Sequence, residues 1–256
     1  MLQDKTQLIK EVEKLPMFVL KKVASNLEQF NLWEEDKTKR VITEDGNIEI
    51  LSLVSDKYKL VQFKEVYEPI LTEFTNLEGF LKYYKGSGIL VVYPEGDIFN
   101  FTEEAFKGKI GILLTNSVDK SLAVNIKFVV YHGGRSFVIP QKENLRALHI
   151  GKIKTLIKNY EGFILKVKES WKVILEKFRK RYLDEEEVDN LFKDIRLSKK
   201  VRREIKEEVI DYNLWDLFVA IVNKISEKEY RNELSQIKKL EKVSNICYEY
   251  AVIEAI

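Results

Sequence analysis

Side chains that could carry out chemistry are few in this 256-residue chain, and none stands in a recognised catalytic spacing. The two histidines, His132 and His149, lack a second ligand three or four residues away, the spacing that places two imidazoles on one helical face. Gly86-Ser87-Gly88 precedes a strand-like run, so it lacks the following helix that a phosphate-binding glycine turn requires. We therefore expect no metal site, no cofactor and no catalytic residue of these kinds.

Two carboxylates and one cysteine are the remaining candidates for catalysis. Asp56 and Asp119 both follow strand-like runs, and together they could bind a metal ion for phosphodiester cleavage. Aspartates in turns more often accept local hydrogen bonds, so a nuclease is the least favoured function. Cys247, the single cysteine, falls on the apolar face of a helical segment, where a thiol behaves as a small hydrophobe, and it excludes an internal disulfide.

Basic residues give the strongest functional signal. The chain has 43 basic and 41 acidic residues, a net charge of +2, but residues 142–182 hold 12 basic and 4 acidic residues, a net charge of +8. On a helix several of these cations share one flank, and such a surface binds phosphates by releasing counterions. The candidate nucleic-acid-binding residues are Lys154, Lys158, Lys168, Lys172, Arg179, Lys199, Lys200, Arg202, Arg203 and Arg135.

A plain solvated helix is the competing interpretation of this flank. Glu161, Glu169 and Glu176 lie on the same side of the helix as the basic residues. Lys172 stands four residues before Glu176, the spacing of a surface ion pair. Aromatic side chains near the basic residues could stack the bases of a single strand, although strand aromatics more often belong to a core. They are Tyr83, Tyr84, Tyr93, Phe128 and Tyr131.

The elements that position these residues divide the chain in two. All prolines and glycines lie at or before Gly162, and short β-branched runs predict strands over 17–23, 48–54, 88–93, 109–115 and 123–131. Residues 63–74 have helical spacing, and residues 117–121 read as a hairpin connection. We predict an α+β fold: a largely antiparallel mixed sheet with one or two helices over 1–140, then an all-helical bundle over 141–256.

The helical part contains a long helix over 151–182 and four shorter helices. Apolar residues recur every three or four positions along the long helix. Asp184 and Ser198 are predicted N-caps of the next two helices, and the apolar faces of the last two run over 214–225 and 234–250.

Composition supports a globular protein, with 45% apolar and 33% charged residues. The polar start carries no secretory signal, and no apolar run is long enough to cross a bilayer, so we expect no membrane partner and a cytoplasmic location, the host cytoplasm if the protein is viral. Abundant lysine, glutamate and isoleucine with little glutamine is met both in thermophile proteins and in AT-rich genomes.

Four short segments resemble motifs of a phage/plasmid-like family of unknown function that occurs on mobile elements. Residues 53–61 are similar to its S-D-x-Y segment, 115–121 to its N-S-H-D-G-S turn, 147–150 to its R-H segment and 213–218 to its T-x-W-D helix. The match spans about residues 17–225. The residues that carry it are Ser55, Asp56, Tyr58, Asn116, Ser117, Asp119, His149, Trp215 and Asp216.

The chain also departs from that family pattern. Val118 and Lys120 replace the histidine and glycine of the turn, and residues 131–134 stand where the family has a cysteine-containing segment. The resemblance implies a mobile-element setting and brings no activity or catalytic residue with it.

Three functions follow from these observations. The favoured one is a mobile-element DNA-binding protein, with binding or annealing of single strands in replication or recombination as its expected activity and homo-oligomers as its expected form. The alternative is a non-enzymatic structural or host-interaction protein, such as a virion component or a counter-defence factor that binds a host protein. The third is the metal-dependent nuclease, so an enzyme is less expected than a binding protein.

Overall fold

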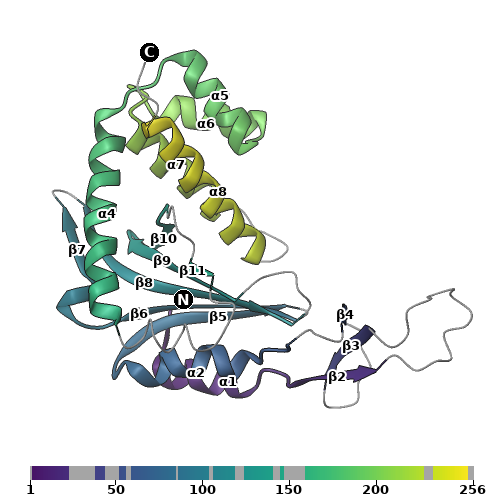
Figure 1. Cartoon of the computed structure of the whole chain (residues 1–256). Helices are drawn as coiled ribbons and strands as arrows, with labels where there is room; N and C mark the ends of the chain where they lie inside the picture. Colours follow the sequence, from purple (N-terminus) through teal and green to yellow (C-terminus); the bar gives the residue numbers. More distant parts are fainter. Residues whose placement is uncertain are drawn as a thin grey trace, which may run out of the picture. The chain divides into compact units, whose positions relative to one another are not determined.

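The computed structural model of the chain divides into two compact units, whose elements are labelled in Figure 1. Unit 1 comprises Met1–Glu95, Ile112–Ile126 and Leu145–Lys158, and unit 2 comprises Gly96–Gly111, Lys127–Asn144 and Asn159–Ile256. The units interleave along the chain, whereas the sequence analysis divided it once, at residue 140. The structure describes residues 2–22, 38–43, 52–55, 59–84, 86–103, 106–118, 124–140, 145–146, 159–227 and 233–252.

Unit 1 is built on antiparallel strands. β1 (Gln3–Asp4) pairs with β5 (Leu77–Tyr84), β5 with β6 (Ser87–Pro94), and β6 with the second half of β8 (Phe106–Ser117). Every residue of β6 is buried, so both of its faces are covered and its sequence is a continuous apolar run rather than an alternating one.

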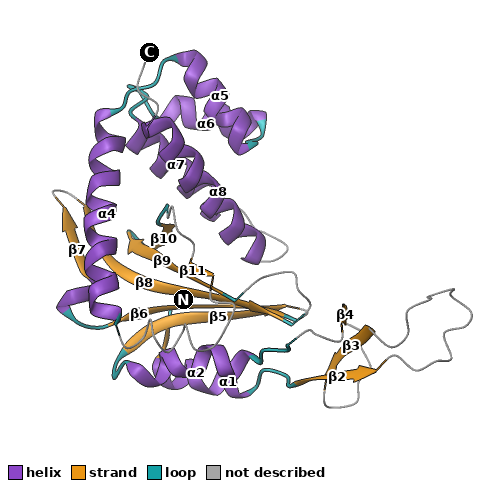
Figure 2. Ribbon diagram, in the orientation of Figure 1, coloured by secondary structure: helices purple, strands orange, loops and turns teal. Residues whose placement is uncertain are grey.

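Two helices pack together on the strands of unit 1. They are α1 (Lys5–Glu13) and α2 (Phe63–Glu73), which lie side by side next to β5 and β6 in Figure 2. The Asp4 carboxylate accepts a hydrogen bond from the Gln7 amide (2.9 Å) and so begins α1. The buried apolar side chains of α2 follow the 3.6-residue period that predicted it: Phe63, Val66, Tyr67, Ile70 and Leu71.

A second, three-stranded antiparallel sheet belongs to the same unit. It contains β2 (Phe18–Lys22), β3 (Thr38–Thr43) and β4 (Ser52–Ser55). The Gln62 side chain connects this sheet to the start of α2, because its Nε2 donates to Phe18 O (2.8 Å) and its Oε1 accepts from Phe18 N (3.2 Å).

Unit 2 combines short strands with the C-terminal helices. The 3₁₀ turn η3 (Asp97–Phe99) leads into β7 (Asn100–Glu103), which pairs with the first half of β8, and β9 (Asn125–His132) pairs with β10 (Arg135–Val138). The helices are α4 (Tyr160–Lys180), α5 (Glu185–Ile195), α6 (Lys199–Glu208), α7 (Leu214–Glu227) and α8 (Glu233–Val252).

Aromatic rings fill the core of unit 2. The ring of Phe106 on β8 packs against the rings of Phe137, Trp171 and Trp215, at centroid distances of 6.4, 6.3 and 5.4 Å. Elements β10, α4 and α7 therefore meet at one side chain. Gly108 lies beside this cluster, where a Cβ atom would stand 2.6 Å from Val130 Cγ1. A glycine is needed there because any larger residue would displace β9 from β8.

The α+β fold class predicted from sequence is confirmed. The helix over 63–74, the strands over 17–23, 88–93, 109–115 and 123–131 and the four C-terminal helices all form, while only residues 52–54 of the strand over 48–54 are described. Residues 151–158 and the centre of the 117–121 connection lie outside the described residues, so α4 is seen from Tyr160. The C-terminal part is not wholly helical, because β11 (Leu145–Arg146) pairs with the start of β9.

Gly88 generates a stability prediction. A Cβ atom at this position would lie 2.7 Å from Tyr67 Oη and 2.8 Å from a ring carbon of Phe63, both on α2. We expect Gly88→Ala to lower the free energy of unfolding by about 1–3 kcal/mol, as overpacking does, in urea titrations. Gly162→Ala is the control, since nothing lies within 4 Å of its Cβ position, and it should leave stability unchanged or raise it. Equal stability of the two variants would contradict the tight fit of α2 on β6.

Candidate nucleic-acid interface

The predicted basic flank of α4 is engaged within unit 2 wherever the structure describes it. Lys168 Nζ donates to Asp97 O (3.4 Å), and Lys172 Nζ lies 3.5 Å from a carboxylate oxygen of Glu103. Arg179 is half-buried, and its carbonyl accepts from Asn213 Nδ2 (2.8 Å). Lys154 and Lys158 lie outside the described residues.

The acidic residues of α4 behave as the solvated-helix interpretation expects. Lys180 Nζ lies 2.5 Å from Glu176, and this ammonium, with a smaller contribution from Lys172, lowers the pKa of Glu176. On this flank, Lys168 already has a carbonyl partner and Lys172 a carboxylate partner.

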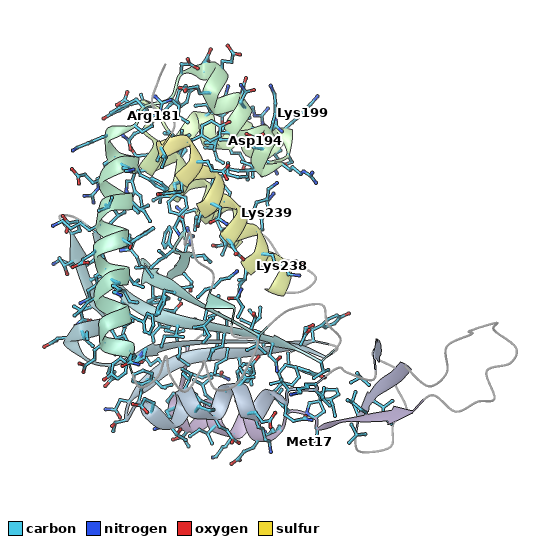
Figure 3. All side chains as sticks on the ribbon, viewed as in Figure 1. Met17, Arg181, Asp194, Lys199, Lys238 and Lys239 are labelled. Atoms are coloured by element: carbon cyan, nitrogen blue, oxygen red, sulfur yellow. The ribbon has the colours of Figure 1, made fainter. Side chains whose placement is uncertain are left out.

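The second predicted cluster begins α6. Lys199, Lys200, Arg202 and Arg203 fall within its first five positions, and the Ser198 hydroxyl accepts from the Val201 amide (3.4 Å) as the N-cap. The side chains of Lys200 and Arg203 are 80% and 76% exposed. Lys199 is exposed and has no hydrogen-bond or ion-pair partner among the described residues (Figure 3).

Charges on α5 and α6 are ordered in opposite ways along the helix axis. A helix has a partial positive charge at its N-terminus and a negative one at its C-terminus, so anions stabilise the first turn and cations the last. α5 follows this rule with Glu185, Glu186 and Glu187 in its first turn and Lys193 in its last. α6 has Lys199, Lys200 and Arg202 and no acidic residue in its first turn, and its last turn holds Glu207 and Glu208 together with Lys206.

This reversal gathers cations at one place in the chain. Residues 193–203, from the last turn of α5 to the first turns of α6, hold six basic residues and one acidic residue, Asp194. Residues 184–189 hold five acidic residues and no basic one. We call the segment 193–203 the basic tip. Its cations are Lys193, Arg196, Lys199, Lys200, Arg202 and Arg203.

The turn inside the basic tip has a defined backbone. Arg196 adopts the left-handed conformation (φ 59°), and the Leu197 amide donates to Phe192 O (3.0 Å) across it. Arg202 Nε donates to Leu197 O (2.9 Å), which ties α6 to the turn.

Helix α8 holds the end of α5 that forms the tip. Lys239 Nζ donates to Ile195 O and Lys242 Nζ to Asp194 O (2.6 Å), so two ammonium groups satisfy carbonyls that the helix end leaves unpaired (Figure 3). Tyr250 Oη also donates to the Asp194 carboxylate (2.9 Å). The only carboxylate of the basic tip is therefore already engaged by α8.

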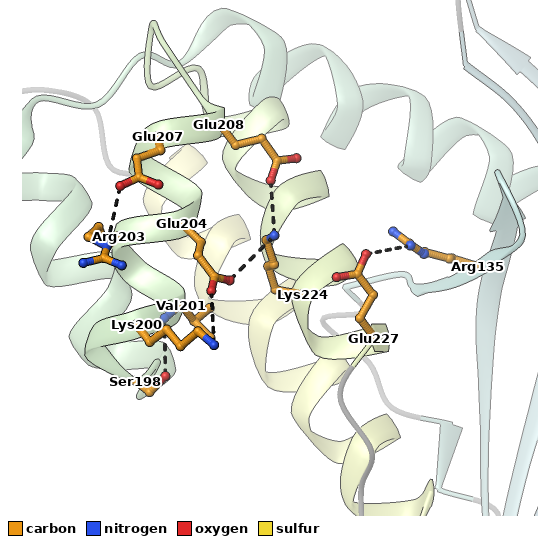
Figure 4. A network of polar contacts seen from close by, with 10 residues as sticks. All are labelled: Arg135, Ser198, Lys200, Val201, Arg203, Glu204, Glu207, Glu208, Lys224 and Glu227. Carbon is orange, nitrogen blue, oxygen red and sulfur yellow. Dashed lines mark hydrogen bonds and ion pairs between the residues drawn. The ribbon is translucent and has the colours of Figure 1, made fainter.

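The second half of α6 is the part attached to the core. Ile205 is its one buried side chain, and Lys206 Nζ lies 2.8 Å from Asp189 of α5. Lys224 Nζ of α7 lies 3.7 Å from a carboxylate oxygen of both Glu204 and Glu208 (Figure 4). Lys200 and Arg203 reach only Glu204 (3.9 Å) and Glu207 (3.5 Å) on the same helix. Such exposed pairs contribute little and open readily.

Arg135 and the sheet aromatics do not extend this surface. Arg135 pairs with Glu227 of α7 at 3.2 Å (Figure 4). Tyr93 and Phe128 are buried in their strands, so neither ring can stack a base. Tyr83 and Tyr84 are partly exposed, but they belong to unit 1.

The residues that carry the family resemblance fall partly inside the described structure. Asn116 Nδ2 donates to Val61 O (3.1 Å), which joins two of the four similar segments, and Ser117 is buried beside it at the end of β8. Trp215 packs in the aromatic core of unit 2, Asp216 is exposed in the first turn of α7, and Ser55 ends β4. Asp56, Tyr58, Asp119 and His149 lie outside the described residues.

Catalytic and metal-binding options find no support in the described part of the chain. It holds no group of three or more potential metal ligands, and the carboxylates of the nuclease hypothesis are not among its residues. Cys247 is fully buried, and burial raises the pKa of its thiol far above the ordinary range. His132 Nδ1 lies 2.7 Å from Lys107 O, and its ring packs on Phe106, a structural arrangement.

Comparison of the chain with protein-family models, curated proteins and solved structures gives no match. Among the described helices none is long and apolar enough to span a bilayer.

The basic tip was predicted only in part. Lys193 and Arg196 were not among the sequence candidates, because they belong to the end of α5 and lie outside the run of cations at 199–203. The order of charges between the two caps, Asp184 and Ser198, was nevertheless readable from sequence alone.

The charge order of α6 predicts an unusual stability change. Lys199→Glu with Lys200→Glu replaces two cations near the positive end of the helix by anions, so the double variant should be more stable than the wild type. We expect a gain of about 0.3–1 kcal/mol from Lys199→Glu in urea unfolding at low salt, decreasing as salt is added, and a smaller gain from Lys200→Glu, because loss of its ion pair with Glu204 costs about 0.2–0.5 kcal/mol. A loss of stability would show that these lysines support the fold.

The ion pair between α5 and α6 predicts a pH dependence. The Lys206 ammonium lowers the pKa of Asp189, and the carboxylate raises the pKa of Lys206. A carboxyl group whose pKa is lower in the folded protein stabilises the fold at pH values above its pKa in the unfolded chain, about 4. This stabilisation is lost as the pH falls through the pKa of the folded state. Asp189→Asn should therefore destabilise the protein at pH 7, and the difference should disappear toward low pH in urea titrations. A difference independent of pH would exclude the pair as its cause.

Proposed function

We propose that the protein binds DNA through the basic tip of unit 2. The order of charges on α6 carries this proposal, because Lys199, Lys200 and Arg202 stand in its first turn, where the helix dipole makes cations unfavourable, while the preceding helix α5 follows the dipole. A charge placed against local stability is best explained by a ligand of opposite sign. Nucleic-acid phosphates are such a ligand for clustered lysine and arginine.

Exposure and geometry support the same proposal. Lys199 is without a partner in the described structure, Lys200 and Arg203 are largely exposed, and the ion pairs that fasten α6 use the opposite half of the helix. Phosphate contacts made by such side chains carry no sequence information. We therefore propose binding that depends strongly on salt and weakly on base sequence.

The mobile-element setting of this function rests on the motif resemblance at residues 53–61, 115–121, 147–150 and 213–218. Self-association and a host protein partner stay predictions from sequence.

Fluorescence anisotropy of a labelled duplex at about 50 and 200 mM salt tests the proposal. We expect wild-type affinity to fall steeply over this range. Lys199→Glu with Lys200→Glu should reduce the slope of the logarithm of the binding constant against the logarithm of the salt concentration by about 1 for each lost phosphate contact. The weaker binding should accompany equal or higher stability, which separates it from misfolding.

Lys166→Glu with Lys177→Glu is the matched control. These two exposed lysines of α4 have no ion-pair partner in the described structure, and their replacement changes the net charge by the same amount. The control should bind as the wild type does. Equal losses in both double variants would show that only net charge matters, and absence of wild-type binding at the lower salt would refute the proposal.

A further inference from the structure

Helix α6 is less buried than α4 and α7 in unit 2. It buries one side chain, Ile205, whereas α4 buries six and α7 seven. Its first turns are therefore surrounded by solvent on most sides, and only its second half is attached to α5 and α7. An α-helix with its side chains is about 10–12 Å wide, close to the roughly 12 Å width of the DNA major groove.

The basic tip contains no ring on which a base could stack. Residues 193–208 include no phenylalanine, tyrosine, tryptophan or histidine. Proteins that bind single strands combine a basic groove with aromatic platforms, so this surface lacks half of what such binding uses. A duplex, by contrast, presents its phosphates at higher density along the axis, and cations alone can follow them.

The tip is also held in one conformation before any ligand arrives. The left-handed Arg196, the Leu197 amide bond to Phe192 O and the Ser198 cap define the turn, and Lys239 and Lys242 of α8 hold the end of α5. A preformed tip loses little conformational entropy on binding a regular helix such as duplex DNA.

From these observations, and resting on the proposed function, we infer that α6 enters the major groove of duplex DNA with its N-terminal turns first. Lys199, Lys200 and Arg203 then lie against the phosphates that border the groove, while Glu204 and Glu208 stay paired with Lys224 of α7. Duplex DNA, and not a single strand, is the substrate class of the basic tip.

Anisotropy competition with wild-type protein tests the inference. Unlabelled duplex and single strand of the same sequence compete for a labelled duplex, and the bound duplex is then challenged with methyl green, which occupies the major groove, or distamycin, which occupies the minor groove. We expect the duplex to compete about tenfold more strongly than the single strand, in line with its higher charge density. Methyl green should displace the protein and distamycin should not.

Failure of the inference and failure of the proposed function give different results. Preferential binding of the single strand, or displacement by distamycin alone, overturns the major-groove inference and leaves DNA binding intact. Absence of binding to either DNA at low salt overturns both. If Lys166→Glu with Lys177→Glu abolishes the duplex preference while Lys199→Glu with Lys200→Glu keeps it, α6 is not the element in the groove.

Discussion

Burial of helix α7 is the constraint on which the arrangement of unit 2 depends. Seven of its side chains are buried, and it lies against α4, α6, α8 and β10. Phe218 contacts the rings of Phe137 and Phe178, so one residue joins β10 and α4 to the bundle. α6 adds little to this core, because its only apolar residues are Val201 and Ile205, of which Ile205 is buried.

The position of α6 follows from that packing and from charge. Lys224 of α7 faces the carboxylates of Glu204 and Glu208, so the acidic half of α6 is the half that meets the core. In the basic half, Lys199 and Lys200 are exposed, and Lys200 shares the Glu204 carboxylate with Lys224. A more stable helix would carry its acids first, as α5 does, but it would present the wrong sign of charge at the tip. Stability and the proposed DNA binding would therefore favour opposite charges in the first turn of α6.

Unit 1 contains buried polar atoms that reduce its stability. Tyr67 Oη and Asn116 Oδ1 are buried and have no hydrogen-bond partner among the described residues, although each such atom costs free energy. Burial raises the pKa of Tyr67 well above its ordinary value, so the phenol stays neutral. Gly88 lies between them, opposite Asn116 in the sheet and against Tyr67 in α2. The close approach of α2 to β6 explains why this position has no side chain.

The helices that form the candidate site were determined by local sequence. Asp184 and Ser198 begin α5 and α6, as their side-chain hydrogen bonds show, and the apolar period places Val188, Leu191, Phe192 and Ile195 on the buried face of α5. Capping and periodicity act within one or two turns, so they can be read without knowledge of the fold. Short strands such as β3, β7 and β10 were not predicted, because they are only six, four and four residues long and strand formation depends on packing against neighbouring strands.

Tertiary structure alone decided which cations are available to a ligand. Lys168, Lys172 and Arg135 looked equivalent to Lys199 and Lys200 in the sequence, yet the first three meet Asp97, Glu103 and Glu227 from other elements. Packing likewise buried Tyr93 and Phe128, which removed the stacking surface that their strands had suggested. The sequence by itself determined the basic tip, since its charges and caps are contiguous. Only the fold determined that this tip is exposed, because exposure depends on what distant segments cover.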